Sequence, residues 1–452
     1  MIIKDKVSLS VNVLFSGIGC QELGIKQTNL FNINVKCTSD INKDSILSYA
    51  ILHHNLSKEL IETYNYYPSF EIMCNELNSK NIGYDFKNNS PYDWKTVKSE
   101  FDLKKYWLAT HLSNNLGDIS KIQKLPYADL WTVSFPCTDI SSSGKMQGFE
   151  FNSKTSSSLL WEQLRLLNVA KSNDELPKFI LFENVKNLLS SLFIYSFKKF
   201  IELLNDLGYN CYYKIINSKD CGVPQGRERV YCICINKNID NMKFTFPFSF
   251  DKGIRVSDIL ESNIEYDKAV AYYSPTNFNL NKICYNSHKI FPLLVENYDR
   301  YSNDRPNKII TLADIKSEND LVCSKSIKEN LHQGNRIFDI NGISPTITAS
   351  GGGLGGNAGL FLIYDKNLDC YIIRKLVGIE CYRLQGIYLD FSKVNAMQEL
   401  GITDFMMCFQ AGNGITTDVI SVLFEHLYKN FYNNNYVCVD KLYSKVKFNK
   451  LF

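Results

Sequence analysis

The first 250 residues predict an α/β fold with a doubly wound, mainly parallel sheet. Short apolar or β-branched runs, typical of strands, alternate with longer stretches that have the apolar spacing of helices. A glycine-rich turn follows the first run, and polar residues follow several later ones. The alternation stops near residue 250, which indicates a second, smaller domain.

The expected strands are 11–15, 33–40, 129–135, 178–185 and 229–235. The expected helices are 158–171, 196–208, 374–387 and 417–432. Residues 55–114 interrupt this order with many Tyr, Asn and Ser residues, so we interpret them as a partly helical insertion. The domain prediction is 1–250 for the α/β domain and 251–370 for the second domain. Residues 371–452 are expected to return to the first domain.

The composition is that of an ordinary globular protein, with 45% apolar and 21% charged residues and a net charge of +3. This charge permits a nucleic-acid partner without requiring one. No apolar run is long enough for a membrane span, and the N-terminus does not resemble a signal peptide. The 14 cysteines include no CxxC pair, so no metal site is expected and a reducing, cytoplasmic location is predicted.

The stretch 13-VLFSGIGCQELG-24 predicts a strand, a glycine turn and a helix start, which would direct backbone N–H groups toward a ligand. The spacing is not the strict GxGxxG, and a tight turn without a ligand explains it about as well. Asp40 ends the next expected strand, where a carboxylate can accept hydrogen bonds from a ribose. Asp118 is a second candidate acid, although such a residue is more often a helix N-cap.

Cys137 follows the apolar run 129–135, in the loop 134-SFPCTDISSSGK-145. A nucleophilic thiolate needs exposure and positive neighbours. Arg227 and Arg229 lie two residues apart at the start of an expected strand, so both are expected to face one side. The alternatives are a thiol without a chemical role and a solvated charge cluster.

Glu183 and Asn184 end the apolar run 178–185. Burial at such a position raises the pKa of a carboxyl group, which suits a general acid. The alternative is an N-cap pair for the next helix. Glu183, Cys137, Asp40 and the arginines all lie at strand ends, and in a doubly wound sheet those ends line one crevice.

Six motifs, in this order, resemble those of the cytosine-C5 DNA methyltransferases, over nearly the whole chain apart from 55–114. They are LFSGIGCQELG, FPCTDISSSGK, FENV, PQGRERVY, PTITASGGG followed by RKLVGIECYRLQGI, and FQAGNGITTDVI. Thr138 stands where this family usually has Gln. The resemblance implies a class I, Rossmann-like methyltransferase domain that uses S-adenosylmethionine, with a target-recognition domain at 251–370.

The resemblance also implies that Cys137 attacks C6 of a cytosine flipped out of double-stranded DNA. Glu183 would contact N3 and the exocyclic amine, Arg229 would hold O2, and Arg227 would add positive charge. Implied cofactor residues are Phe15, Ser16, Gly17, Gly19, Asp40, Ile41, Asp118, Ile119, Pro136, Leu159 and Asn413. Implied DNA-binding residues are Ser143, Lys145, Asn341, Gly351, Gly352 and Gly353, although Asn341 precedes a glycine and also fits a β-turn.

Three other functions compete with this one. An RNA methyltransferase acting on tRNA shares the catalytic motifs, but the Cys-Phe-Thr triplet of those relatives is absent. A nicotinamide or flavin oxidoreductase would explain Gly17, Gly19 and Asp40 but not the other motifs. An inactive DNA-binding relative would be expected to lose Cys137 or Glu183. The family resemblance further implies a monomer, with or without a cognate restriction endonuclease.

Overall fold

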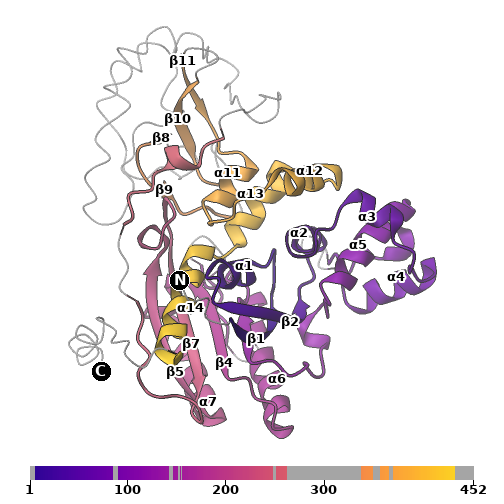
Figure 1. The fold of residues 1–452 in the computed structure, drawn as a ribbon. Helices are drawn as coiled ribbons and strands as arrows, with labels where there is room; N and C mark the ends of the chain where they lie inside the picture. Colours follow the sequence, from indigo (N-terminus) through magenta and orange to yellow (C-terminus); the bar gives the residue numbers. More distant parts are fainter. Residues whose placement is uncertain are drawn as a thin grey trace.

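The computed structural model describes residues 6–84, 90–141, 146–150, 153, 155–247, 251–261, 337–349, 357–365 and 370–432. Its main element is a six-stranded sheet in the order β2-β1-β3-β4-β7-β5 (Figure 1). These strands are β1 (Val7–Leu14), β2 (Phe31–Ser39), β3 (Leu130–Val133), β4 (Phe179–Val185), β5 (Tyr209–Asn217) and β7 (Glu228–Asn236). Strands β1 to β4 pair in parallel, and β7 runs antiparallel to β4 and β5. The predicted fold class is confirmed.

Helices cover both faces of this sheet. Alternate residues of β7 show the two layers, because Tyr231, Ile233 and Ile235 belong to one hydrophobic cluster and Val230, Cys232 and Cys234 to the other. The first cluster includes α1 (Cys20–Gln27), α2 (Lys43–His54) and α14 (Thr417–Tyr432), and the second includes α6 (Leu160–Ser172) and α7 (Ile194–Leu207). No helix in the described part of the chain is long and apolar enough to cross a membrane.

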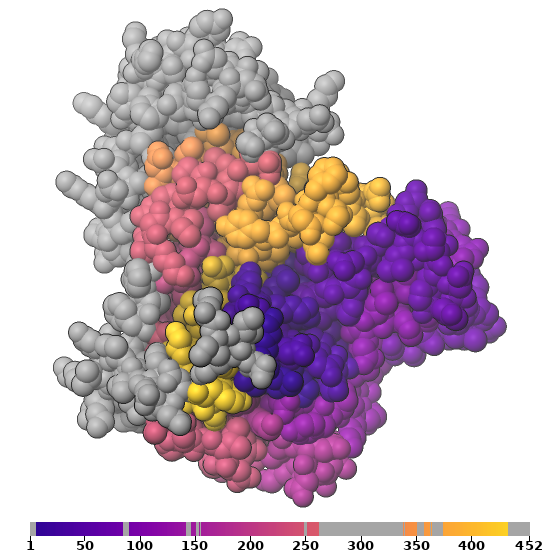
Figure 2. Space-filling view, viewed as in Figure 1, coloured from indigo at the N-terminus to yellow at the C-terminus, as the bar shows by residue number. Residues whose placement is uncertain are grey.

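The stretch 55–114 is helical over much of its length. It contains α3 (Lys58–Thr63), α4 (Phe70–Ser79) and α5 (Glu100–Leu112). Side chains of Ser57, Ser69 and Ser99 cap the N-termini of these helices by accepting backbone hydrogen bonds. In Figures 1 and 2 these purple helices form a lobe beside α2, and α5 packs against α2.

The C-terminal part of the described chain returns to the main sheet. Helix α14 packs against α1, and the two helices approach so closely that a Cβ atom on Gly24 would lie 2.5 Å from Cβ of Ile420. Before it come α11 (Gly378–Arg383), α12 (Phe391–Glu399) and α13 (Asp404–Asn413). The strands outside the main sheet are β6 (Gln225–Gly226), β8 (Ile337–Asp339), β9 (Ser344–Pro345), β10 (Leu360–Asp365) and β11 (Cys370–Arg374).

Two local expectations were wrong. Residues 374–387 do not form one helix, because β11 ends at Arg374 and α11 begins only at Gly378. A local ion pair spans the break: both guanidinium NH groups of Arg374 contact the two carboxylate oxygens of Glu380, six residues later, at 2.7 Å. Strand β5 was not expected, and its pairing with β7 forms the edge of the sheet.

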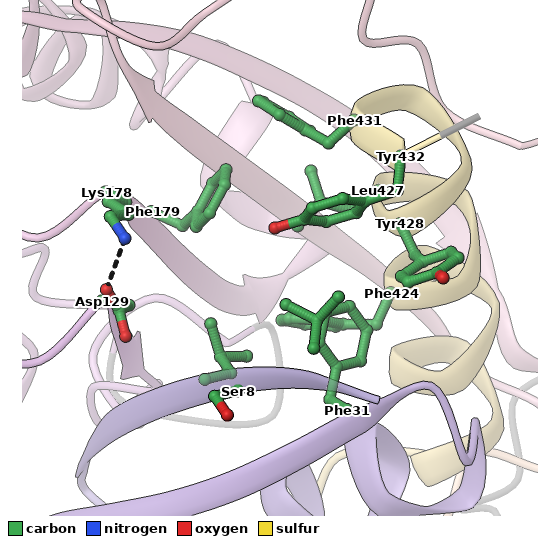
Figure 3. Close-up of a pocket in the computed structure, with 12 residues that line it drawn as sticks. Ser8, Phe31, Asp129, Lys178, Phe179, Phe424, Leu427, Tyr428, Phe431 and Tyr432 are labelled. Carbon is green, nitrogen blue, oxygen red and sulfur yellow. Dashed lines mark ion pairs between the residues drawn. The ribbon is translucent and has the colours of Figure 1, made fainter. Parts of the chain in front are cut away.

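The pocket in Figure 3 lies at the N-terminal ends of the parallel strands, where Phe31 starts β2 and Phe179 starts β4. Phe31 packs edge-on against Phe424 and Tyr428 of α14, with ring centroids 5.9 and 5.7 Å apart. The candidate chemical groups follow the opposite, carboxyl ends of the same strands. This aromatic pocket is therefore not the candidate active site.

The Arg374–Glu380 pair yields a stability prediction. Both side chains are buried, so Glu380→Ala would leave a charged guanidinium buried without its partner. We expect this change to lower the free energy of unfolding by about 3–5 kcal/mol. Urea denaturation measures the loss, with Glu399→Ala at an exposed position of α12 as the control. Equal midpoints for the two variants would contradict the prediction.

Candidate active site

The turn after β1 holds an unusual backbone conformation. Phe15, Gly17 and Gly19 have φ values of +53°, +53° and +81°. Phe15 is strained in this region of φ, and such strain is concentrated at functional sites. The turn is fixed at Ser16, whose N–H donates to the Ser39 carbonyl at 3.0 Å. A Cβ on Gly17 would meet nothing within 4 Å, so the turn leaves open space at this residue.

A buried polar cluster of Glu22, Tyr49 and His53 packs against this turn, and the sequence analysis did not identify it. Glu22 of α1 contacts Nδ1 of His53 at 3.2 Å and accepts a hydrogen bond from Tyr49. Burial opposes ionisation of Glu22, but His53 and Lys26 outweigh it and lower its pKa. His53 Nε2 also lies 3.1 Å from the carbonyl of Ile18 in the turn. His53 and Tyr49 come from α2, so only the tertiary fold brings them to this turn.

Asp40 links the turn to the end of β2. Its Oδ2 accepts from the Gly17 N–H at 2.7 Å and its Oδ1 from the Asn42 N–H at 2.8 Å. Burial raises the pKa of Asp40, although these backbone hydrogen bonds oppose the shift. A carboxylate accepts about four hydrogen bonds. Asp40 therefore keeps acceptor capacity for a hydroxyl-bearing ligand.

The other predicted cofactor residues occupy different environments. Asp118 caps the short turn Ile119–Lys121 by accepting from the Ser120 N–H, and its second oxygen accepts from Asn81. Ile119 is buried, Ile41, Pro136 and Leu159 are half-buried, and Asn413 is exposed at the end of α13. The N-cap interpretation of Asp118 is thus correct, and it leaves room for a second role.

The catalytic candidates meet beyond β3, β4 and β7. Cys137 is half-buried in the loop after β3, and Glu183 is 7% exposed within β4. Arg229 lies on β7, and its Nε is 3.3 Å from Oε1 of Glu183. Glu183 pairs with Tyr231 in the sheet, so Arg229 is its diagonal neighbour. Glu183 is therefore not a helix N-cap, whereas Asn184 Nδ2 donates to the Phe135 carbonyl and positions the loop before Cys137.

The electrostatics of this cluster keep both acidic groups protonated to higher pH than usual. Burial raises the pKa of the Glu183 carboxyl, although Arg229 and Arg227 oppose the shift. Burial also raises the pKa of the Cys137 thiol, and Glu183 adds to this effect while Arg229 and Arg227 oppose it. The predicted positive neighbours are present, but they do not outweigh burial. In the absence of substrate the thiol is therefore the favoured form.

Arg227 lies one residue before β7, and both Arg227 and Arg229 act on the charges of Glu183 and Cys137. The guanidinium of Arg227 donates to the carbonyl groups of Ile347 at 3.0 Å, Gly412 at 3.1 Å and Gly414 at 2.7 Å. Burial, with repulsion from Arg229, lowers the pKa of Arg227 to about 10. Arg227 stays charged at neutral pH and joins three segments beside the site.

Hydrogen bonds join the residues next to Cys137 to Ser156 and Ser157. Asp139 is buried, and its Oδ2 accepts from the Ser157 N–H at 3.1 Å and from the Ser156 hydroxyl at 2.7 Å. Ser157 donates in turn to the Pro136 carbonyl at 2.7 Å. Thr138, which replaces the usual Gln, shares a hydrogen bond of 2.5 Å with Ser156. These contacts fix the two ends of the loop and hold the backbone next to Cys137.

The predicted DNA-binding residues are mostly outside the described residues, namely Ser143, Lys145, Gly351, Gly352 and Gly353. Asn341 is described, and it is exposed in the turn that follows β8. This position agrees with the β-turn interpretation.

The doubly wound sheet, the turn after β1 and the thiol beside a buried carboxyl group together define a class I methyltransferase. A family model described as "C-5 cytosine-specific DNA methylase" matches residues 94–429, and the chain belongs to this family. It is an S-adenosylmethionine-dependent enzyme that methylates C5 of cytosine in DNA.

Relatives and solved structures agree with this assignment. The Type II methyltransferase M2.ScrFI of Lactococcus lactis subsp. cremoris is 38% identical over 267 residues, which are 57% of this chain and 68% of that protein. The orphan methyltransferase M.SssI of Spiroplasma monobiae is 26% identical over 433 residues, 93% of this chain and 97% of its own. The Entamoeba histolytica methyltransferase EhMeth, at 16% identity, covers 95% of this chain and 100% of its own with a TM-score of 0.53, which supports the fold.

The raised pKa of Cys137 predicts its reactivity. Alkylation by iodoacetamide follows the thiolate fraction, so the rate at Cys137 should continue to rise beyond the pH at which an ordinary cysteine levels off. Glu183→Gln removes a negative neighbour and should move the profile to lower pH, whereas Arg229→Met should move it to higher pH. Mass spectrometry of the Cys137 peptide measures the rates. Shifts of the same sign in both variants would contradict the electrostatic account.

Proposed function

We propose that the chain methylates a cytosine through a covalent bond between Cys137 and C6 of the base. The observation that carries this proposal is the meeting of Cys137 after β3, Glu183 near the carboxyl end of β4 and Arg229 at the amino end of the antiparallel strand β7. The thiolate adds to C6, and the electron pair of the C5–C6 double bond makes C5 nucleophilic. Cytosine C5 is otherwise a poor nucleophile, so this addition is the necessary first step.

The protein groups stabilise that addition. Glu183, whose raised pKa favours the protonated carboxyl, donates to N3 of the ring and accepts from the exocyclic amine. Arg229 donates to O2, and the positive charges of Arg229 and Arg227 favour the thiolate once substrate is bound. After the methyl group has joined C5, the C5 proton passes to a base or to water and the bond between Cys137 and C6 breaks. The thiol and the aromatic ring are then restored.

The residues around the turn after β1 fit S-adenosylmethionine, which supplies an electrophilic methyl group when bound. The open space at Gly17 leaves room for a ligand to approach the backbone. Asp40 has acceptor capacity and would bind the ribose hydroxyl groups, Phe15 would stack near the adenine, and Asp118 would accept from the adenine amine. Asn413, exposed at the end of α13, would contact the methionine part of the cofactor. The remaining proposed cofactor residues are Ser16, Gly19, Ile41, Ile119, Pro136 and Leu159.

Residues 251–370 act as the DNA-reading domain in this proposal, and 1–250 with 371–452 form the catalytic domain. Supporting observations are the pairing of β8 with β10 outside the main sheet and the packing of α14 on α1. A base inside a duplex cannot reach Cys137, so the target cytosine is flipped out. Ser143 and Lys145 then contact the opened DNA, and Asn341 with Gly351–Gly353 reads its sequence. The enzyme acts as a monomer in the cytoplasm, with any restriction endonuclease as a separate protein.

The first test is transfer of a labelled methyl group to unmethylated genomic DNA and to bulk tRNA in parallel. Cys137→Ala should lose transfer by roughly 10³-fold or more because it removes the nucleophile. Cys211→Ala, a half-buried thiol on β5, is the matched control and should keep full activity. Label in DNA as 5-methylcytosine is the expected result. Label in tRNA alone, or full activity of Cys137→Ala, would overturn the proposal.

Glu183→Gln tests the acid. It keeps the size of the side chain but cannot protonate N3, so we expect transfer to slow by roughly 10²–10⁴-fold. Binding of S-adenosylmethionine should be unchanged, which calorimetry measures. A wild-type rate would remove Glu183 from the mechanism, and lost cofactor binding would point to a folding defect.

A further inference from the structure

The insertion at 55–114 contacts the same strand ends that carry the candidate cofactor acids. At the end of β2, the Gly83 N–H donates to the carbonyl of Ile41, next to Asp40, at 2.8 Å. The Tyr106 hydroxyl donates to Asp44 at 3.0 Å, and Lys43 lies 5.1 Å from the centre of the Tyr106 ring. The inserted helices are therefore attached to the segment that follows β2.

The same insertion also reaches Asp118. The Asp118 N–H donates to the Lys80 carbonyl at 3.0 Å, and Nδ2 of Asn81 donates to Oδ2 of Asp118 at 2.8 Å. The approach is close: a Cβ on Gly117, which has φ +78°, would lie 2.2 Å from the Lys80 oxygen. The turn at 80–83 thus touches both acidic segments of the candidate cofactor site.

The orientation of the Asn81 amide is determined by its neighbours. Nζ of Lys121 donates to Oδ1 of Asn81 at 2.7 Å and to the Ser79 carbonyl at 3.2 Å. An ammonium group can only donate and a carboxylate can only accept. The amide oxygen must therefore face Lys121 and the amide nitrogen must face Asp118.

The backbone around Asn81 is fixed as well. Asn81 has φ +57°, a left-handed conformation that asparagine tolerates better than most residues. The next residue, Ile82, is fully buried, and its carbonyl accepts from the indole N–H of buried Trp94 at 2.7 Å. The turn is thus held from inside the insertion while its polar side chain points to Asp118.

We infer that the 55–114 insertion forms the outer wall of the adenosine half of the cofactor site, with Asn81 as the residue that positions the Asp118 carboxylate. This inference rests on the proposed cofactor site. One Asp118 oxygen is held by Ser120 and the other by Asn81, so the carboxylate cannot rotate away from the site. Asn81 acts through Asp118 and is a positioning residue, not a catalytic one.

The test variant is Asn81→Gly, which removes the amide while keeping a residue that adopts positive φ without strain. Calorimetry with the full chain should show S-adenosylmethionine binding weakened by roughly five- to tenfold, in keeping with the loss of a hydrogen bond to a charged group. The kcat at saturating cofactor and the KM for DNA should not change. The matched control is Asn29→Gly, an exposed asparagine that also has φ +57°, and it should bind as the wild type does.

A double-mutant cycle distinguishes positioning from general support of the fold. Asp118→Ala should weaken binding by itself, and adding Asn81→Gly should weaken it no further. If the affinity losses of the two single variants multiply in the double variant, or if Asn81→Gly binds S-adenosylmethionine normally, the inference is wrong. Lys121→Met frees the amide to rotate and should give a smaller loss of the same kind, so a normal affinity in this folded variant would also count against it. Absence of S-adenosylmethionine binding in the wild type would instead refute the proposed cofactor site.

Discussion

The guanidinium group of Arg227 is the contact on which the geometry of the site depends. It binds the carbonyl groups of Ile347 and Gly412, which lie 120 and 185 positions further along the chain. A buried guanidinium must find acceptors for its donors, and here those acceptors come from segments that no local interaction could bring together. The end of α13, the segment after β9 and the start of β7 are therefore fixed relative to one another.

Burial also raises the pKa of the two acidic groups of the site. Placing Cys137 and Glu183 in a buried position raises the pKa of both groups, and two arginines only partly compensate. A thiolate that persisted without substrate would be open to alkylation and oxidation. A protonated Glu183 is the form needed to donate to a ring nitrogen. Burial thus shifts both groups toward their protonated forms before substrate binds.

The cofactor side depends on a different set of long-range contacts. Glu22, Tyr49 and His53 form a buried cluster that contacts the turn after β1 at the Ile18 carbonyl. Asn81 and the turn at 80–83 hold the acidic segments from outside. The helices α3 to α5 lie beside α2 (Figure 1), and the Asn114 carbonyl, just after α5, accepts from the Thr38 N–H of the edge strand β2. A smaller chain without the 55–114 insertion would need another partner for Asp118.

The sequence alone determined the fold class, five of the six strands of the main sheet, and the positions of Cys137, Glu183 and Asp40 at strand ends. These features follow from apolar periodicity and glycine turns, which are local properties of the chain. It did not indicate β5, the break between β11 and α11, the contacts of Arg227, or the contact between Asn81 and Asp118. The contacts of Arg227 and Asn81 join residues far apart in sequence, and only the tertiary structure decides which distant polar groups become partners once the hydrophobic layers exclude water.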